Sequence, residues 1–208
     1  FVNDALERVM LDWNSVFPIS LKGKYVNLVP LGIDHATDLR EAVLDGPLTD
    51  LWYTNIPSSD EMETEITRRL DLEKIKTMAP FSVLDLSRMK VVGMTTFMNI
   101  DGINKRLEIG STWYRNDVQR SPINTECKSL LLNYAFDTLG CIAVEFRTHF
   151  MNRQSRAAIE RLGAKCDGIL RSHMILANGT IRDTAVYSIT QNEWASVREN
   201  LKWLIKKY

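Results

Sequence analysis

Hydrophobic and polar positions alternate along the chain with two different periods, which separates strand-like segments from helix-like ones. Leu107 and Ile109 alternate with Glu108 and Gly110, and this period of two predicts a strand. Directly afterwards, residues 123–135 place hydrophobic side chains at helical spacing. The same reasoning predicts strands at residues 25–29, 80–86, 91–99, 105–114, 144–148, 164–176 and 182–189. It predicts helices at residues 2–17, 34–44, 60–76, 121–140, 152–163 and 194–205.

The connections between these segments predict how the strands pair. Residues 87–90, 101–104 and 177–180 have the composition of hairpin turns, so the strands on either side of each are expected to be antiparallel. A helix lies between the strands that end at Tyr114 and begin near Val144, and such a crossover places its two strands parallel. The order therefore predicts an α+β fold with a mixed sheet.

The first residues carry a hydrophobic stripe at helical spacing, which ends at Pro18. We expect a helical extension at residues 1–20, followed by one domain at residues 21–208. The stripe has two readings: it packs on the domain itself, or it contacts a partner subunit in a homodimer. Its members are Val2, Leu6, Val9, Met10, Trp13 and Phe17.

Charge and hydropathy exclude two classes of partner. The chain has 208 residues, with 26 Lys and Arg against 26 Asp and Glu, so its formal net charge is zero. A general nucleic-acid binder needs an excess of positive charge to neutralise phosphates, so nucleic acid is not an expected partner. No hydrophobic run is long enough to span a bilayer, and the acidic residues among the first twenty are atypical of a secretory signal.

Cysteine and histidine spacing gives no sign of a disulfide framework or a metal site. The three cysteines are scattered and form no CxxC pair, which favours a reducing cytoplasm. Cys127 falls on the hydrophobic face of its predicted helix, so we expect it in the core. The three histidines also lack the spacing of metal ligands. These residues are Cys127, Cys141, Cys166, His35, His149 and His173.

The junction QRSPINTECK, residues 119–128, has the features of an anion-binding helix start. Ser121 is a suitable N-cap and Pro122 suits the first helical position. Such a helix end leaves backbone N–H groups unpaired and carries a partial positive charge, so it favours a phosphate. Arg120 would add a charge-assisted contact. On local pattern alone, an ordinary strand–loop–helix junction with a good cap is the other reading.

Five segments in this order resemble the GNAT superfamily of acyl-CoA-dependent N-acetyltransferases, in the branch similar to RimJ and RimL. They are LKGKYVNLVPL at 21–31, LEIGSTWY at 107–114, QRSPINTECKSLLLNYAF at 119–136, NRQSRAAIERLGAKCDGILRSH at 152–173 and RDTAVYSITQNEW at 182–194. The resemblance implies a mixed, mostly antiparallel central sheet flanked by helices on both faces. It also implies acetyl-CoA as cosubstrate and an amine as acceptor.

The resemblance assigns the donor site to two helix starts and a strand end. It implies that pyrophosphate lies at the helix after Arg120, and that the pantetheine arm pairs with free backbone groups near Trp113 and Tyr114. Those backbone N–H groups would also stabilise the oxyanion. Asn152 either bonds pantetheine or serves only as a cap. The candidate residues for acetyl-CoA are Trp113, Tyr114, Arg120, Ser121, Ile123, Asn124, Thr125, Asn152, Ser155 and Arg156.

Two positions depart from the superfamily's pattern. Pro122 and Asn124 stand where its pyrophosphate loop usually has glycine, and Pro122 contributes no backbone N–H. Ile159 stands where many members have the tyrosine that protonates the leaving thiolate. Ser121 and Ser155 are candidate donors to phosphate, pantetheine or thiolate, and the sequence does not rank these roles.

Glu108 is the candidate general base. An alkyl amine has a pKa near ~10, so some group must accept a proton before the nitrogen can attack a thioester. Glu108 lies on the strand that resembles the acetyl-CoA strand, on the face opposite Ile109. The other reading of Glu108 is a cross-strand ion pair or a solvated charge.

The leading function is acetyl transfer from acetyl-CoA to a primary amine by direct attack, with a protein N-terminus or a small molecule as acceptor. Because Ile159 replaces the usual acid, a non-catalytic acyl-CoA-binding module is an alternative. Transfer of another acyl group, such as succinyl, is a further one.

Overall fold

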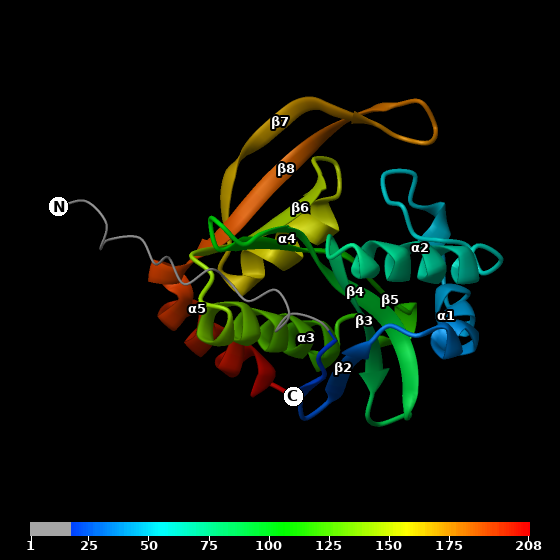
Figure 1. Ribbon diagram of the computed structural model, residues 1–208, viewed down its shortest axis with the longest axis horizontal. Coiled ribbons are helices and arrows are strands. Elements are labelled where there is room, and N and C mark those ends of the chain that lie inside the picture. Colours follow the sequence, from blue (N-terminus) through cyan, green and yellow to red (C-terminus); the bar gives the residue numbers. More distant parts are fainter. Residues whose placement is uncertain (1–17) are drawn as a thin grey trace.

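The computed structural model describes residues 18–208, so the helix expected at residues 2–17 lies outside the described residues. The described strands form one sheet in the order β1-β2-β3-β4-β5-β6-β8-β7 (Figure 1). All neighbouring strands are antiparallel except β5 and β6. The predicted mixed sheet and its parallel pair are therefore confirmed.

The strands follow the predicted ranges within a few residues, except the two-residue β1, which was not predicted. Their bounds are Leu21–Lys22 (β1), Val26–Pro30 (β2), Met78–Asp85 (β3), Lys90–Asp101 (β4), Arg106–Tyr114 (β5), Ala143–His149 (β6), Lys165–Ile175 (β7) and Ile181–Thr190 (β8). The helices are Ala36–Val43 (α1), Met62–Lys74 (α2), Pro122–Asn133 (α3), Arg153–Leu162 (α4) and Gln191–Ile205 (α5). A π-helical turn, Tyr134–Thr138, extends α3.

Helices cover both faces of the sheet, as the resemblance implied. Hydrophobic residues of α1 and α2 pack with Met94 and Trp113 on one face. Those of α3, α4 and α5 pack with Leu107 and Ile109 on the other, and Cys127 lies in this core as predicted. Figure 1 shows α1 and α2 on one side of the strands and α3 and α5 on the opposite side. None of the helices in residues 18–208 is long and hydrophobic enough to cross a membrane.

The start of α1 differs from the expected helix start at Asp34. A short 3₁₀ helix, Ile33–His35, precedes α1, and His35 rather than Asp34 is the N-cap. His35 makes no side-chain capping bond to α1; its Nδ1 instead accepts the N–H of Gly32, the N-cap of the 3₁₀ helix, at 3.1 Å.

Glu126 joins α3 to the start of the sheet. Its buried carboxylate accepts three backbone N–H groups, from Lys24 at 2.9 Å, Tyr25 at 2.6 Å and Val26 at 2.9 Å. A Cβ at Gly23 would come within 2.7 Å of this carboxylate, so the approach requires glycine there. Hydrogen bonds to a charged acceptor are the stronger kind, and these three fix the position of α3.

Replacing Glu126 should therefore destabilise the whole domain. Glu126→Ala leaves three backbone donors without their acceptor, and we expect the free energy of unfolding to fall by about 2–4 kcal/mol in urea titrations. Glu63→Ala is the matched control, because Glu63 makes a solvent-exposed ion pair with Arg40 and should change stability by less than about 1 kcal/mol. Equal losses in the two variants would contradict the anchoring role.

Candidate active site

The sheet opens between its two parallel strands. β5 and β6 pair only over Arg106–Glu108 and Ala143–Glu145. Beyond these residues β5 continues alongside β4 as far as Tyr114, and β6 continues alongside β8 as far as His149. The facing edges of β5 and β6 therefore carry backbone N–H and C=O groups that have no ladder partner. An extended ligand arm can pair with such an edge as an added strand would.

A bulge in β5 accompanies this opening, and a buried arginine holds it. The pairing of β4 with β5 shifts register around Ser111, whose φ of 46° is left-handed. Arg69 of α2 donates to the Ser111 carbonyl at 3.2 Å and to Thr96 Oγ1 at 2.9 Å. Its Nε is 2.7 Å from Glu65. Burial lowers the pKa of Arg69, and the Glu65 carboxylate opposes that effect.

The start of α3 has the predicted cap. Ser121 Oγ accepts the N–H of Ile123 at 3.3 Å and donates to the Val118 carbonyl at 2.5 Å, while Pro122 is the first helical residue. Arg120 is exposed and left-handed, with a φ of 62°. A cavity of about 420 Å³ borders Ser121, Pro122 and Ile123, so this helix end opens to solvent.

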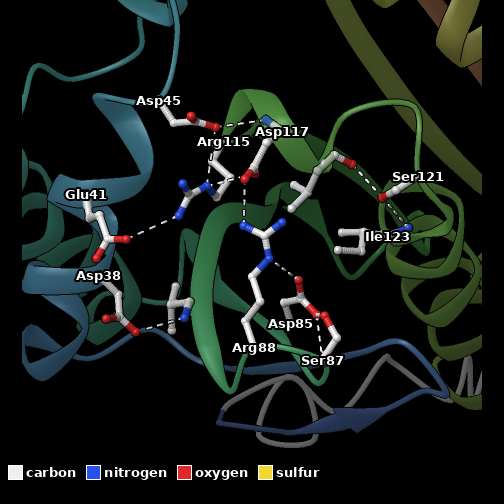
Figure 2. Close-up of polar contacts among 12 residues, drawn as sticks. Asp38, Glu41, Asp45, Asp85, Ser87, Arg88, Arg115, Asp117, Ser121 and Ile123 are labelled. Atoms are coloured by element: carbon white, nitrogen blue, oxygen red, sulfur yellow. Dashed lines mark hydrogen bonds and ion pairs between the residues drawn. The ribbon is translucent and has the colours of Figure 1, made fainter.

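An ion network fixes the loop that leads into α3 (Figure 2). Arg115 Nε lies 2.8 Å from Asp117 and 3.3 Å from Asp45, and the Asp117 N–H donates to Asp45 at 2.8 Å. Arg88, from the β3–β4 turn, lies 2.7 Å from Asp117. The backbone hydrogen bond from Asp117 is the main cause that lowers the pKa of Asp45. Two segments distant in sequence, the one after α1 and the β3–β4 turn, therefore determine where the loop lies.

Side-chain contacts connect the first turn of α3 and the loop before it to both ends of α4. Arg161 donates to Thr125 Oγ1 at 3.1 Å, and Gln154 donates to Gln119 at 3.2 Å. Asn152 caps α4 by accepting the Ser155 N–H at 2.9 Å, as predicted. The two helices that carry the candidate residues for acetyl-CoA therefore lie side by side. Nearby, Asn124 Oδ1 is buried and has no hydrogen-bond partner among the described residues.

Other donor candidates have structural contacts of their own. The rings of Trp113 and Tyr114 are buried, so their backbone rather than their side chains faces the opening. Burial is the main cause that raises the pKa of Tyr114. Arg156 Nε donates to the Tyr187 hydroxyl at 2.8 Å, and its Nη1 donates to the Phe150 carbonyl at 3.3 Å.

Glu108 lies at the last paired position before the opening. Asn99 donates to Glu108 Oε2 at 2.7 Å, and Arg147 Nε lies 3.5 Å from the same oxygen. Burial raises the pKa of Glu108; the Asn99 hydrogen bond and the Arg147 charge oppose this, and Glu145 adds to it. A Cβ at Gly110 would lie 2.9 Å from Glu108 Oε1, so Gly110 leaves room beside the carboxylate. Glu108 is thus part of an ion pair, as one of its two predicted readings has it, while burial still raises its pKa.

A hydrophobic core residue, Ile159, stands at the position where many members of the superfamily have the acidic tyrosine. Ile159 is 8% exposed and packs in the hydrophobic cluster beneath α4. The Ser155 hydroxyl, by contrast, is half-buried at the start of α4 and makes no hydrogen bond to any described residue.

Comparison with known proteins identifies the family. The acetyltransferase (GNAT) domain family matches residues 26–165. A curated protein, the putative ribosomal N-acetyltransferase YdaF of Bacillus subtilis (strain 168), is 32% identical over 102 residues, which cover 49% of this chain and 55% of YdaF. The match thus spans about half the length of that relative.

Solved structures extend the similarity over most of the chain. A GCN5-related N-acetyltransferase from Brucella melitensis is 31% identical, with a TM-score of 0.82 over 90% of this chain and 86% of that one. MccE, the microcin self-immunity acetyltransferase, was crystallised with acetyl-CoA and AMP; it is 19% identical, with a TM-score of 0.70 over 81% of this chain and 93% of MccE, and shares the fold. As the resemblance to the RimJ and RimL branch implied, the chain belongs to the GNAT acetyltransferase family, the acyl-CoA-dependent N-acyltransferases.

Proposed function

We propose that the protein transfers an acetyl group from acetyl-CoA to a primary amine, with the thioester held in the opening between β5 and β6. The observation that carries this proposal is the three-residue pairing of β5 and β6, with Glu108 at its last position. The free strand edge accepts the pantetheine arm, and the Glu108 carboxylate lies where that arm would bring the reacting carbonyl.

The donor site in this proposal follows the two helix starts. The pyrophosphate binds at the start of α3, through backbone N–H groups from Ser121 to Thr125 and through the Arg120 guanidinium. Ile123 and Asn124 belong to this turn. Asn152 contributes its side-chain amide to pantetheine, in addition to its capping bond.

The reaction proceeds by direct attack. Glu108 accepts a proton from the ammonium group, directly or through water, and the freed nitrogen lone pair forms the C–N bond. Backbone N–H groups near Trp113 and Tyr114 stabilise the oxyanion of the tetrahedral intermediate. The C–S bond then breaks, the nitrogen releases its second proton to water, and CoA leaves as a thiolate that takes up a proton.

Ser155 is the proposed donor of that proton, since its hydroxyl makes no hydrogen bond to the described residues. The Ser121 hydroxyl, the other candidate, already donates to the Val118 carbonyl. Ser121 therefore contributes by shaping the start of α3.

The acceptor is a protein N-terminus or a small-molecule amine. The name of YdaF supports the first class, because it describes a ribosomal N-acetyltransferase. The three free cysteines are in keeping with the reducing, cytoplasmic setting that the sequence predicts.

Glu108→Gln tests the base. The variant should retain acetyl-CoA affinity but lose about 10²–10⁴-fold in kcat/KM at neutral pH, measured as CoA thiol release with a panel of amines. Burial raises the pKa of Glu108, so wild-type activity should fall as pH drops through a value above the ordinary range of a glutamate pKa. That acidic limb should be missing in the variant, whose remaining rate rises only with the fraction of free amine.

Glu63→Gln on the surface of α2 is the control and should behave as wild type. Full activity of Glu108→Gln across pH would remove Glu108 from the mechanism. Tight acetyl-CoA binding without thiol release from any amine would favour the binding module instead. A higher rate with succinyl-CoA than with acetyl-CoA would favour the other acyl donor.

Arg69 tests whether the bulge positions the donor strand. Arg69→Met should reduce stability by about 1–3 kcal/mol, because Thr96 Oγ1 and the Ser111 carbonyl lose their buried donor, while Glu65 keeps its pair with Arg68. It should also reduce kcat about tenfold at saturating acetyl-CoA. The double variant Glu65→Met/Arg69→Met also removes the carboxylate that has lost one of its two arginines, and it should recover part of the stability in urea titrations, yet leave kcat low because the Ser111 carbonyl stays unbound. Recovery of both quantities would mean that Arg69 has only a structural role.

We also propose that residues 1–20 form an extension whose hydrophobic stripe makes a homodimer contact. Removing residues 1–18 should convert a dimer to a monomer in light-scattering measurements of molar mass. An unchanged molar mass would leave the stripe to its other predicted role, packing on the domain.

A further inference from the structure

A polar cluster lies on the face of the sheet that carries Glu108. It takes no part in the proposed acetyl-CoA site. His149, at the end of β6, lies opposite Thr184 of β8. Arg182 Nε donates to Thr184 Oγ1 at 2.9 Å. Trp52 and Tyr53, from the loop between α1 and α2, pack against the His149 ring, with centroids 5.2 and 6.0 Å away. Segments far apart in the sequence thus converge on one place.

The cluster lies on the same face of the sheet as Glu108. Glu108 is paired with Glu145 across the β5–β6 ladder, and side chains of one strand alternate between faces. Glu145, Arg147 and His149 therefore share a face, while Phe146 between them lies in the core under α4. The charge of Arg182 also acts on Glu108, which places the two groups in one region.

His149 presents a hydrogen-bond donor that the protein leaves unused. Its Nδ1 accepts the N–H of Met151 at 3.0 Å, so the proton of the neutral ring is on Nε2. Nε2 is buried and has no partner among the described residues. Burial and the nearby Arg182 charge lower the pKa of His149, which favours this neutral form. A buried donor of this kind requires an explanation, and a ligand acceptor is one.

Arg182 presents unused donors as well. Its single hydrogen bond to a described residue uses Nε, and no described carboxylate lies within ion-pair distance of it. The neighbouring Arg147, in contrast, is paired with Glu145 at 2.9 Å. The guanidinium group of Arg182 is therefore available to a carboxylate or a phosphate, and it can bind either of them through two parallel hydrogen bonds.

The aromatic side chains define one wall of this place. Trp52 is 51% exposed although its ring packs on His149, and Tyr53 meets it edge to face at 5.4 Å. An exposed tryptophan beside unused polar donors is typical of a surface that binds a ligand's apolar part.

We propose that the acceptor is a primary amine that also carries an oxyanion group, a carboxylate or a phosphate, which binds the Arg182 guanidinium and the His149 Nε2–H beside Trp52. This inference rests on the proposed acetyl transfer and narrows its substrate class. The amine then points toward Glu108 while the anionic end is held by the cluster. Amines without an anionic group leave Arg182 and His149 without a partner, which gives the site its selectivity.

Matched pairs of amines test the proposal with the full chain and saturating acetyl-CoA. The pairs are 4-aminobutyrate with butylamine, L-phenylalanine with phenethylamine, and O-phosphoethanolamine with ethanolamine. We expect about 10- to 100-fold higher kcat/KM for the anionic member of at least one pair. Carboxylates and phosphates are separated by which pair shows the preference.

Arg182→Met should abolish that preference by lowering kcat/KM for the anionic amine alone, and Arg182→Lys should restore part of it. Arg171→Met is the matched control, because Arg171 lies on the same hairpin but is 82% exposed and paired with Asp183. Calorimetric binding of the preferred anionic amine to wild type and Arg182→Met gives a second readout that does not depend on turnover.

The results that would contradict the oxyanion proposal differ from those that would contradict acetyl transfer. If neutral amines, or a peptide N-terminus without acidic side chains, are acetylated as well as the anionic ones, the oxyanion proposal is wrong while acetyl transfer stands. An equal loss for both members of a pair in Arg182→Met also overturns it. If no amine of any kind releases CoA, the proposed function fails instead.

Discussion

The structure depends on one constraint: the sheet stops pairing between β5 and β6 after three residues. Unpaired backbone groups are costly when buried, so an opening of this kind persists only where both strands are held from elsewhere. β6 is held by its continuous ladder with β8, from Ala143 to His149. β5 is held by β4 and by Arg69, which reaches from α2 to the bulge at Ser111. The opening therefore remains available to an extended ligand.

Helix α3 connects this opening to the place where the pyrophosphate is proposed to bind. Glu126 fixes the helix to the first strands through three backbone N–H groups. On another side, Lys128 is buried and donates to Thr112 Oγ1 at 2.9 Å, just after the bulge. Burial lowers the pKa of Lys128 to about 8. Because α3 is bound to β2 and to β5, its start is fixed relative to the opening, so the proposed sites for the two ends of acetyl-CoA lie at a set separation.

Local patterns predicted the elements and the groups that act through their own segment. Ser121 and Asn152 cap their helices as their positions implied, and Glu108 faces away from the core because strand side chains alternate. Arg69 and Arg182 were not predicted. The partners of Arg69 lie in other segments of the chain, and the sequence does not show on which face of the sheet Arg182 lies. The contact from Arg69 to Ser111 spans 42 positions, and no periodicity encodes it.

The environment of Glu108 shows which physical effect dominates at the centre of the site. A cation at 3.5 Å and a hydrogen bond at 2.7 Å both favour the charged carboxylate, and in a stabilising ion pair they would lower its pKa. Here burial is the larger effect and the pKa rises. Arg147 is shared with Glu145, so its charge is only partly available to Glu108. The fold therefore keeps a carboxylate whose charged form is disfavoured by burial, and such a group is suited to accept a proton from an amine.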